Sequence, residues 1–180
     1  MTRRKMLLMT AGATVLGLAV VVGFADHNVI FADDDDDEGR EALIKKLGDA
    51  KISLQQGLAA SEQGGQPISG KFEVEEGKLQ LSAYTAKDGK FFEALVNHVT
   101  GKVLKLEPIT EGDDLAAANS QSAAMAKAKT SLREAVDKAV TQSANARVVS
   151  AVPSLKDGRP VVAIVLLDGE QFKTVQQSLD

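Results

Sequence analysis

The chain spells the same helix start twice. Ser53 is followed three residues later by Gln56, and Ser131 is followed three residues later by Glu134. This spacing is that of a capping box, in which the serine hydroxyl caps a free backbone N–H and the later side chain reaches back to the serine N–H. Two such starts, one in each half of a chain of 180 residues, predict two copies of one small module.

The sequence after each predicted helix changes from a helical to an alternating pattern, which is typical of half-buried strands. Short turns that contain glycine separate the alternating runs and are typical of antiparallel hairpins. Glu76-Gly77 matches Asp157-Gly158, and Asp88-Gly89 matches Asp168-Gly169. The strands predicted for the second copy are Arg147 to Ser154, Pro160 to Leu167 and Gln171 to Ser178; those of the first copy centre on Phe72, Leu81 and Ala94, with a fourth at Lys102 to Leu106.

These patterns predict an α+β fold of two tandem repeats. Each repeat has one or two helices packed on a three- to four-stranded antiparallel meander sheet. The first repeat covers residues 41–110 and the second covers residues 111–180, where the chain stops without a fourth strand. We expect a first helix through Leu43, Leu47 and Ala50, and an Ala-rich helix over Leu115 to Lys129 after a short acidic joint.

The run Val96-Asn97-His98-Val99-Thr100-Gly101-Lys102-Val103, which follows the third predicted strand, resembles the turn of the PepSY domain family. The chain departs from the family pattern at Asn97, where the family usually has Asp, and the second copy lacks the Thr-Gly part. The resemblance implies two PepSY-like modules. Such domains occur in propeptides of secreted metallopeptidases and as free-standing modules of cell-envelope proteins, and no catalytic residues come with the family.

The N-terminus has the form of an export signal. Arg3, Arg4 and Lys5 precede an uncharged apolar run from Met6 to Ala25. The run is either removed, after Ala25 or after Ala32, or retained as a membrane anchor, since it is long enough to span a bilayer. The predicted location is therefore periplasmic or secreted, or membrane-anchored if the signal is not cleaved.

Composition excludes several kinds of site. The chain has no Cys and two His, His27 and His98, which removes disulfides, thiolate metal sites and most zinc sites. Loss of residues 1–25 leaves 18 basic and 25 acidic residues, a net charge of −7 that disfavours nucleic acid as a partner. No set of nucleophile, base and orienting residue is present, so we expect neither an enzyme nor a cofactor.

Residues Asp33 to Asp37, followed by Glu38 and Gly39, form an acidic run within a predicted flexible linker over residues 26–40. A calcium-binding EF-hand loop that starts at Asp34 needs a glutamate at its twelfth position, but Lys45 stands there. The run is therefore interpreted as a solvated spacer, with weak binding of divalent cations as the alternative.

The candidate partner-binding residues lie on strands. Gln171 to Leu179 has no strand after it, so its backbone offers an edge to which an extended peptide can add, with Phe172, Thr174 and Gln176 as contact residues. Alternatively, this strand pairs the two copies with each other. Tyr84 and Phe91 either form an exposed aromatic contact or pack across their hairpin. His98 and the turns at Lys87-Asp88-Gly89-Lys90 and Lys156-Asp157-Gly158-Arg159 are interpreted as polar turn residues.

These observations favour an exported, non-enzymatic protein-binding module of the cell envelope that modulates or inhibits a protease. Its expected partner is a peptidase or an extended peptide at a sheet edge. The alternative is a structural or sensory envelope protein that binds divalent cations weakly through the acidic run.

Overall fold

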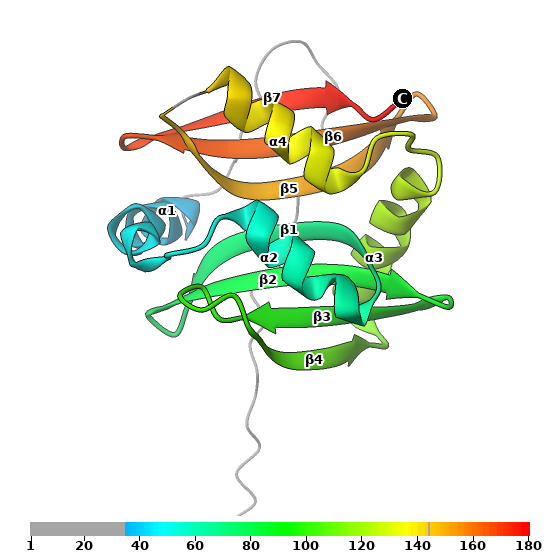
Figure 1. Cartoon of the computed structure of the whole chain (residues 1–180), viewed down its shortest axis with the longest axis horizontal. Helices are drawn as coiled ribbons and strands as arrows, with labels where there is room; N and C mark the ends of the chain where they lie inside the picture. The colour runs from blue at the N-terminus through cyan, green and yellow to red at the C-terminus, as the bar shows by residue number, and fades with distance from the viewer. Residues whose placement is uncertain (1–34, 144) are drawn as a thin grey trace, which may run out of the picture.

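The computed structural model describes residues 35–143 and 145–180. Figure 1 shows one antiparallel sheet with helices on both of its faces. The strands lie in the order β4-β3-β2-β1-β5-β6-β7. The elements are α1 (Asp35–Lys46), the short 3-10 helix η1 (Leu47–Asp49), α2 (Leu54–Ser61), η2 (Glu62–Gly64), β1 (Gln66–Glu75), β2 (Lys78–Lys87), β3 (Lys90–Val96), β4 (Val103–Ile109), α3 (Gly112–Met125), α4 (Leu132–Gln142), β5 (Arg147–Lys156), β6 (Arg159–Asp168) and β7 (Gln171–Ser178).

The α+β class predicted from the sequence is confirmed, but the strands form one sheet and not two small ones. The two meanders join because β1 pairs with β5, at Gly70 opposite Ala151 and at Lys71 opposite Ser150. The expectation that β7 pairs the two copies with each other is therefore wrong. Pairing through β1 and β5 leaves β7 at one end of the sheet and β4 at the other.

Helices α2 and α4 cover the same face of the sheet, as Figure 1 shows. A Cβ atom added at Gly70 of β1 would stand 2.9 Å from the Leu58 Cδ2 atom of α2, which places Gly70 on this helix-covered face. We call it the front face. Buried side chains from the helices and from the strands of both meanders form one continuous core, which includes Leu58, Leu81, Val136 and Ile164. One shared core thus takes the place of the two small cores that separate modules would have.

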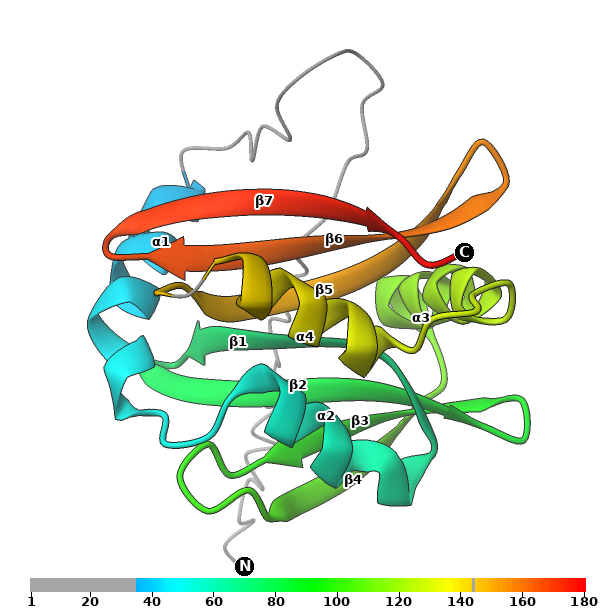
Figure 2. The ribbon, with the colours of Figure 1, turned by 45° about the horizontal axis from the view of Figure 1, so that its top comes forward.

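Helices α1 and α3 lie near opposite ends of the strands (Figure 2). The Ser69 hydroxyl donates to the Gln121 Oε1 atom of α3 over 2.6 Å. Because neighbouring residues of a strand point to opposite faces, Ser69 lies on the face opposite Gly70, which we call the back face. At the other end, the Arg147 guanidinium of β5 donates to the carbonyl oxygens of Leu47, over 2.6 Å, and Ala50, over 3.3 Å.

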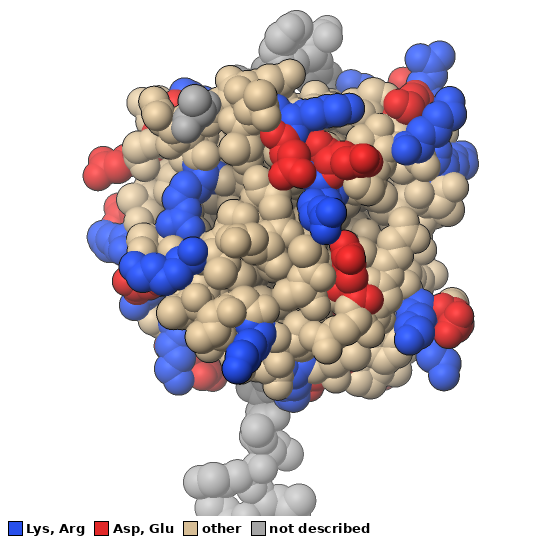
Figure 3. All heavy atoms as spheres, viewed as in Figure 1, with Lys and Arg blue, Asp and Glu red and all other residues tan. Residues whose placement is uncertain are grey.

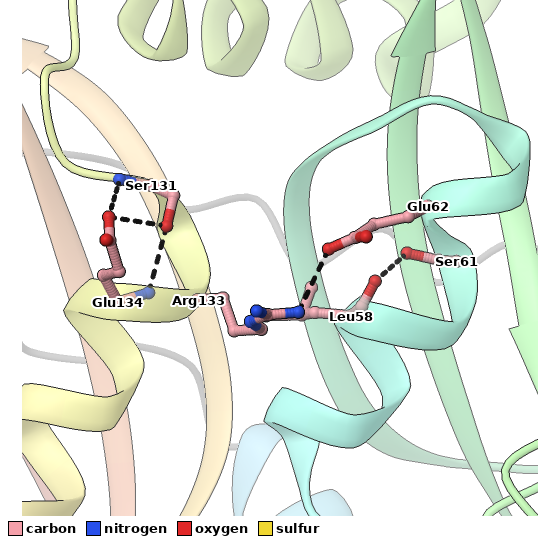
Figure 4. Close-up of polar contacts among 6 residues, drawn as sticks. All are labelled: Leu58, Ser61, Glu62, Ser131, Arg133 and Glu134. Atoms are coloured by element: carbon pink, nitrogen blue, oxygen red, sulfur yellow. Dashed lines mark hydrogen bonds and ion pairs between the residues drawn. The ribbon is translucent and has the colours of Figure 1, made fainter.

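Both predicted capping boxes are confirmed. The Ser53 hydroxyl accepts from the Gln56 N–H while the Gln56 side chain accepts from the Ser53 N–H, and Ser131 and Glu134 make the same two bonds. Figure 4 shows the second box, together with an ion pair in which Arg133 of α4 contacts Glu62, just after α2, over 3.3 Å. The pair joins the start of α4 to the end of α2 on the front face.

The limits of helices α1 and α3 differ from those predicted from the sequence. Helix α1 begins at Asp35, so residues 35–40, which the sequence places in a flexible linker, are helical. Helix α3 begins at Gly112 and ends at Met125, about one turn earlier at each end than expected. Asp113 and Asp114 lie in its first turn, where a carboxylate is favoured by the helix dipole. The acidic joint is thus a helix start.

Candidate interaction edge

Strand β7 pairs with β6 on one side only, and no strand of the described residues pairs with its other side. The Leu179 N–H donates to the Pro160 carbonyl over 2.9 Å. Bonded and non-bonded pairs alternate along an antiparallel ladder, so every second residue back from Leu179 bonds to β6. The residues between them, Phe172, Thr174, Gln176 and Ser178, direct their backbone N–H and C=O groups away from β6. We call this row of backbone groups the outer edge of β7.

Three of the residues predicted as contacts, Phe172, Thr174 and Gln176, are therefore those whose backbone groups form the outer edge of β7. The sequence suggests them only for their place on the last strand; the register of β6 and β7 explains why these residues, and not their neighbours, are suitable. Whether a partner contacts them stays a prediction.

The start of β7 lies against helix α1. The Arg40 guanidinium carbon stands 5.0 Å from the centre of the Phe172 ring, within the range of a cation–π contact. Around them is a shallow hollow of about 530 Å³, lined by both residues together with Glu41, Ile44, Glu170 and Gln171. Phe172 is half-buried and Gln176 is exposed. The side chain of Phe172 is thus held by α1 while its backbone faces outward.

The other end of the sheet, β4, differs in chemistry. Pro108 stands in this strand and has no N–H to offer, and Lys105 and Glu107 form an ion pair of 2.6 Å. Proline and charged side chains are the usual features that prevent an edge strand from pairing with another chain. Leu104 and Leu106 of β4 are 63% and 41% exposed. β7 contains no proline, and its one charged residue, Lys173, pairs with Asp168 of β6 over 2.7 Å.

The predicted aromatic pair does not form directly. Tyr84 of β2 lies opposite Glu93 of β3, and Phe91 lies opposite Ala86. Phe91 is only 8% exposed and belongs to the core, and Tyr84 is half-buried. Sheet packing therefore describes both residues better than an exposed aromatic contact does.

Tyr84 lies within a polar cluster on the back face that sequence patterns alone do not reveal. The cluster consists of Lys71, Glu73, Gln80, Ser82, Tyr84 and Glu93. The buried Ser82 hydroxyl donates to the Glu73 Oε1 atom over 3.2 Å, and Lys71 pairs with Glu73 over 2.6 Å. Those on the same strand occupy every second position, so alternation predicts their shared face but not their contacts.

Burial raises the pKa of the Tyr84 hydroxyl well above its ordinary value, and the nearby Glu93 and Glu73 carboxylates raise it further. Burial also raises the pKa of Glu93, against the lowering effect of a hydrogen bond with Ser82. In both cases desolvation of the charged form is the largest cause. Tyr84 is therefore a neutral hydrogen-bonding group at ordinary pH.

His98 is half-buried and acts through its backbone. Its carbonyl oxygen accepts from the N–H groups of Lys51, over 2.8 Å, and Ile52, over 3.2 Å. In the second half of the chain the Leu179 carbonyl accepts in the same way from Lys129 and Thr130, over 2.7 and 3.0 Å. These bonds fix each strand end to the segment before a capping box. The backbone of His98 therefore has a structural role.

The charged turns are solvent-exposed, as predicted, and Asp88 and Asp157 each have a φ of 51° before a glycine. Figure 3 shows that acidic and basic side chains are interspersed on the front face, with no large area of one sign. Among residues 35–143 and 145–180, no group of three or more His, Cys, Asp or Glu is placed to hold a metal ion.

The N-terminal predictions lie outside the described residues. They concern the export signal, its cleavage and the start of the acidic run at Asp33 and Asp34. Within the described part of the chain, no helix is long and apolar enough to cross a membrane. Searches with this chain found no match among family models, curated proteins or solved structures.

Proposed function

We propose that the chain is an exported, non-enzymatic protein-binding element of the cell envelope, and that its partner docks at the outer edge of β7. The observation that carries this proposal is the row of outward backbone groups at Phe172, Thr174 and Gln176, in a strand without the proline that interrupts the outer side of β4. Such an edge binds an extended segment through main-chain hydrogen bonds.

The proposal includes two tandem PepSY-like modules, residues 41–110 and 111–180. Three pairs of features support a repeat. The capping boxes recur, the carbonyl anchors at His98 and Leu179 recur, and the register shifts of β1 and β5, at Pro67/Ser69 and Val148/Ser150, fall at corresponding positions. Gly70 and Ala151, which face each other between β1 and β5, each follow their register shift by one position. The two modules are then related by an approximate two-fold axis through this pair.

The resemblance to PepSY domains extends the proposal to the partner, which is a peptidase whose activity the module modulates. The export-signal form of the N-terminus supports an encounter in the periplasm or outside the cell, with the chain membrane-anchored where the signal is retained.

Site-directed crosslinking in the native envelope tests this function. Because the chain contains no Cys, a single cysteine introduces a unique attachment point. Thr174→Cys places a short photoactivated crosslinker at the outer edge of β7, and Leu104→Cys places it at β4 as a matched control. We expect an adduct of defined mass from Thr174→Cys and none from Leu104→Cys. No adduct at either position, or equal adducts at both, would contradict the proposal.

A further inference from the structure

The outer edge of β7 has a counterpart within the same molecule, and that counterpart is paired with a strand. The β2–β3 and β6–β7 hairpins close in the same way, with Lys87 opposite Lys90 and Asp168 opposite Gln171 around two-residue turns. Counting from these closing pairs, Phe91, Glu93 and Leu95 of β3 correspond to Phe172, Thr174 and Gln176 of β7.

Strand β4 covers these three residues of β3. Ile109 lies opposite Phe91, Glu107 opposite Glu93 and Lys105 opposite Leu95. The strand runs antiparallel to β3, and its side chains alternate between the two faces of the sheet. The same positions beside β7 hold no strand of the described residues. The first half of the molecule thus shows how a strand fits there.

We propose that the occupant of the β7 edge is an extended polypeptide segment of a partner protein, which adds antiparallel to β7 as an eighth strand in the register by which β4 pairs with β3. This inference rests on the proposed function and specifies the form of the partner. Its basis is continuity with the β3–β4 pairing, which uses corresponding residues, corresponding hairpins and the same strand direction.

The register specifies the chemistry of the docking segment. It presents an apolar residue opposite Phe172, as Ile109 is opposite Phe91, and an apolar residue opposite Val175, as Leu106 is opposite Ala94. Val175 is half-buried and packs against the core, so an apolar neighbour extends that packing. The residues opposite Phe172, Thr174 and Gln176 each need a backbone N–H, which excludes proline at these three positions.

Lys173, which lies between Phe172 and Thr174, is already paired with Asp168 over 2.7 Å. Its charge is therefore balanced within the molecule, and the segment needs no acidic residue opposite it. A basic residue there is disfavoured by repulsion between like charges on opposite strands.

A synthetic peptide with the sequence of residues 102–109, KVLKLEPI, is the probe. It is titrated into the isotopically labelled chain without residues 1–25, and amide exchange is followed by NMR. At a peptide concentration about ten times its Kd, we expect exchange at Phe172, Thr174 and Gln176 to slow about tenfold, because only the free fraction exchanges. The amides of Lys173 and Val175 face β6 and should change little.

Two matched controls separate strand addition from unspecific adhesion. The peptide that carries Glu107→Pro lacks an inward N–H and should not bind, whereas the natural Pro108 faces away from the pairing side. In the protein, Thr174→Pro removes an outward N–H without removing a bond to β6 and should abolish binding. Thr174→Val keeps the N–H and should bind. The melting temperature of each variant shows that it is folded.

Two results of the exchange experiment would show that a partner segment is not what binds at the outer edge of β7. Slow exchange at Phe172, Thr174 and Gln176 before peptide is added overturns the proposal, because the edge is then covered by the chain itself or by a second copy; sedimentation distinguishes these two. Protection at β3 instead of β7 also overturns it, because the peptide has then replaced β4.

The result also separates this inference from the proposed function. A crosslink at Thr174→Cys in the envelope together with no peptide-induced protection supports the function and contradicts the strand register. Protection by the peptide without any envelope adduct shows the reverse: the edge accepts a strand, but the proposed cellular role fails.

Discussion

The two halves of the molecule, residues 35–111 and 112–180, each contain a capped helix and an antiparallel meander, but they end differently. In the first half the third strand is covered by β4, whose Pro108 and Lys105–Glu107 pair discourage further pairing. In the second half no strand of the described residues pairs with the outer side of the third strand, β7. Since the helix starts, turns and strand registers correspond, the difference lies in what covers the third strand. This comparison indicates the outer edge of β7 as the site of interaction.

The back faces of the halves differ as well. Positions that correspond by their distance from the hairpin turns are polar in the first half and mainly apolar in the second. Lys71, Ser82, Tyr84 and Glu93 correspond to Val152, Ala163, Val165 and Thr174. The back face thus has a polar network over the first half and mainly apolar side chains over the second, with Val165 buried in the core.

Helix α1 and the residues that follow it contact strands of the second half. By sequence α1 belongs to the first half, but Arg147 of the second half binds the carbonyls of Leu47 and Ala50 that follow it. Arg40 of α1 stacks on Phe172 of β7. Helix α1 and the residues after it therefore pack against the second half. We expect the two halves to unfold together in one transition.

Arg147→Met gives the largest expected effect. It removes two charge-assisted hydrogen bonds from partly buried carbonyl groups and should lower the free energy of unfolding by about 1.5–3 kcal/mol. Urea unfolding followed by circular dichroism measures the change, and one transition should remain.

Arg133→Met is the matched control, because Arg133 also links the two halves, through Glu62. Both partners of this pair are about half exposed, so its loss should cost about 0–1 kcal/mol. Equal losses for the two arginines, or two separate transitions in either variant, would contradict the shared-element interpretation.

The second test concerns how the halves fill equivalent core positions. A Cβ atom at Gly57 of α2 would stand 2.6 Å from the Leu81 Cδ2 atom. The corresponding residues in the second half, counted from the serine caps and the hairpin turns, are Ala135 and Val162, both fully buried. The first half thus combines a smaller helix residue with a larger strand residue, and the second half combines a larger helix residue with a smaller strand residue.

Gly57→Ala should therefore lower the free energy of unfolding by about 1–2 kcal/mol, because overpacking outweighs the better helix propensity of alanine. Leu81 is fully buried and has little room to move away. The double variant Gly57→Ala/Leu81→Val reproduces the second half and should recover about 1 kcal/mol relative to the sum of the single changes. Strictly additive losses in urea unfolding would show that the two positions are not coupled.

Features with a local sequence signal could be predicted from the sequence. The capping boxes at Ser53 and Ser131 and the strand limits of β5, β6 and β7 follow from residues within a few positions of each other. Features whose determinants are distant could not be predicted. The β1–β5 pairing rests on two opposed small residues, Gly70 and Ala151, which lie far apart in the sequence and carry no pairing signal of their own.

The candidate site shows the same division. The alternating pattern of β7 is visible in the sequence, but which of its residues face outward depends on the register with β6. The burial of Phe91 and the contact of Arg40 with Phe172 depend on the packing of other strands and of α1. Alternation predicts the face of a side chain; its neighbours come from tertiary structure.

The smallest expected effect distinguishes the two capping boxes, of which only the second is charged. The Ser131 N–H and hydroxyl each donate to the Glu134 Oε2 atom over 2.9 Å, whereas the Ser53 N–H donates to the neutral Gln56 Oε1 atom over 2.8 Å. The hydrogen bond from the Ser131 backbone, followed by that from its hydroxyl, lowers the pKa of Glu134. A lowered pKa means that the folded state favours the carboxylate, so this contribution is complete above the unfolded pKa of about 4.3 and is lost as pH falls through the folded pKa.

Glu134→Gln should therefore destabilise the protein at pH 7 but not in acid below the folded pKa, as measured by urea unfolding at a series of pH values. Gln56→Glu should do the opposite and stabilise the protein at pH 7 only. If Glu134→Gln and the unchanged chain differ by the same free energy at every pH, the charge of the second box has no part in its stability.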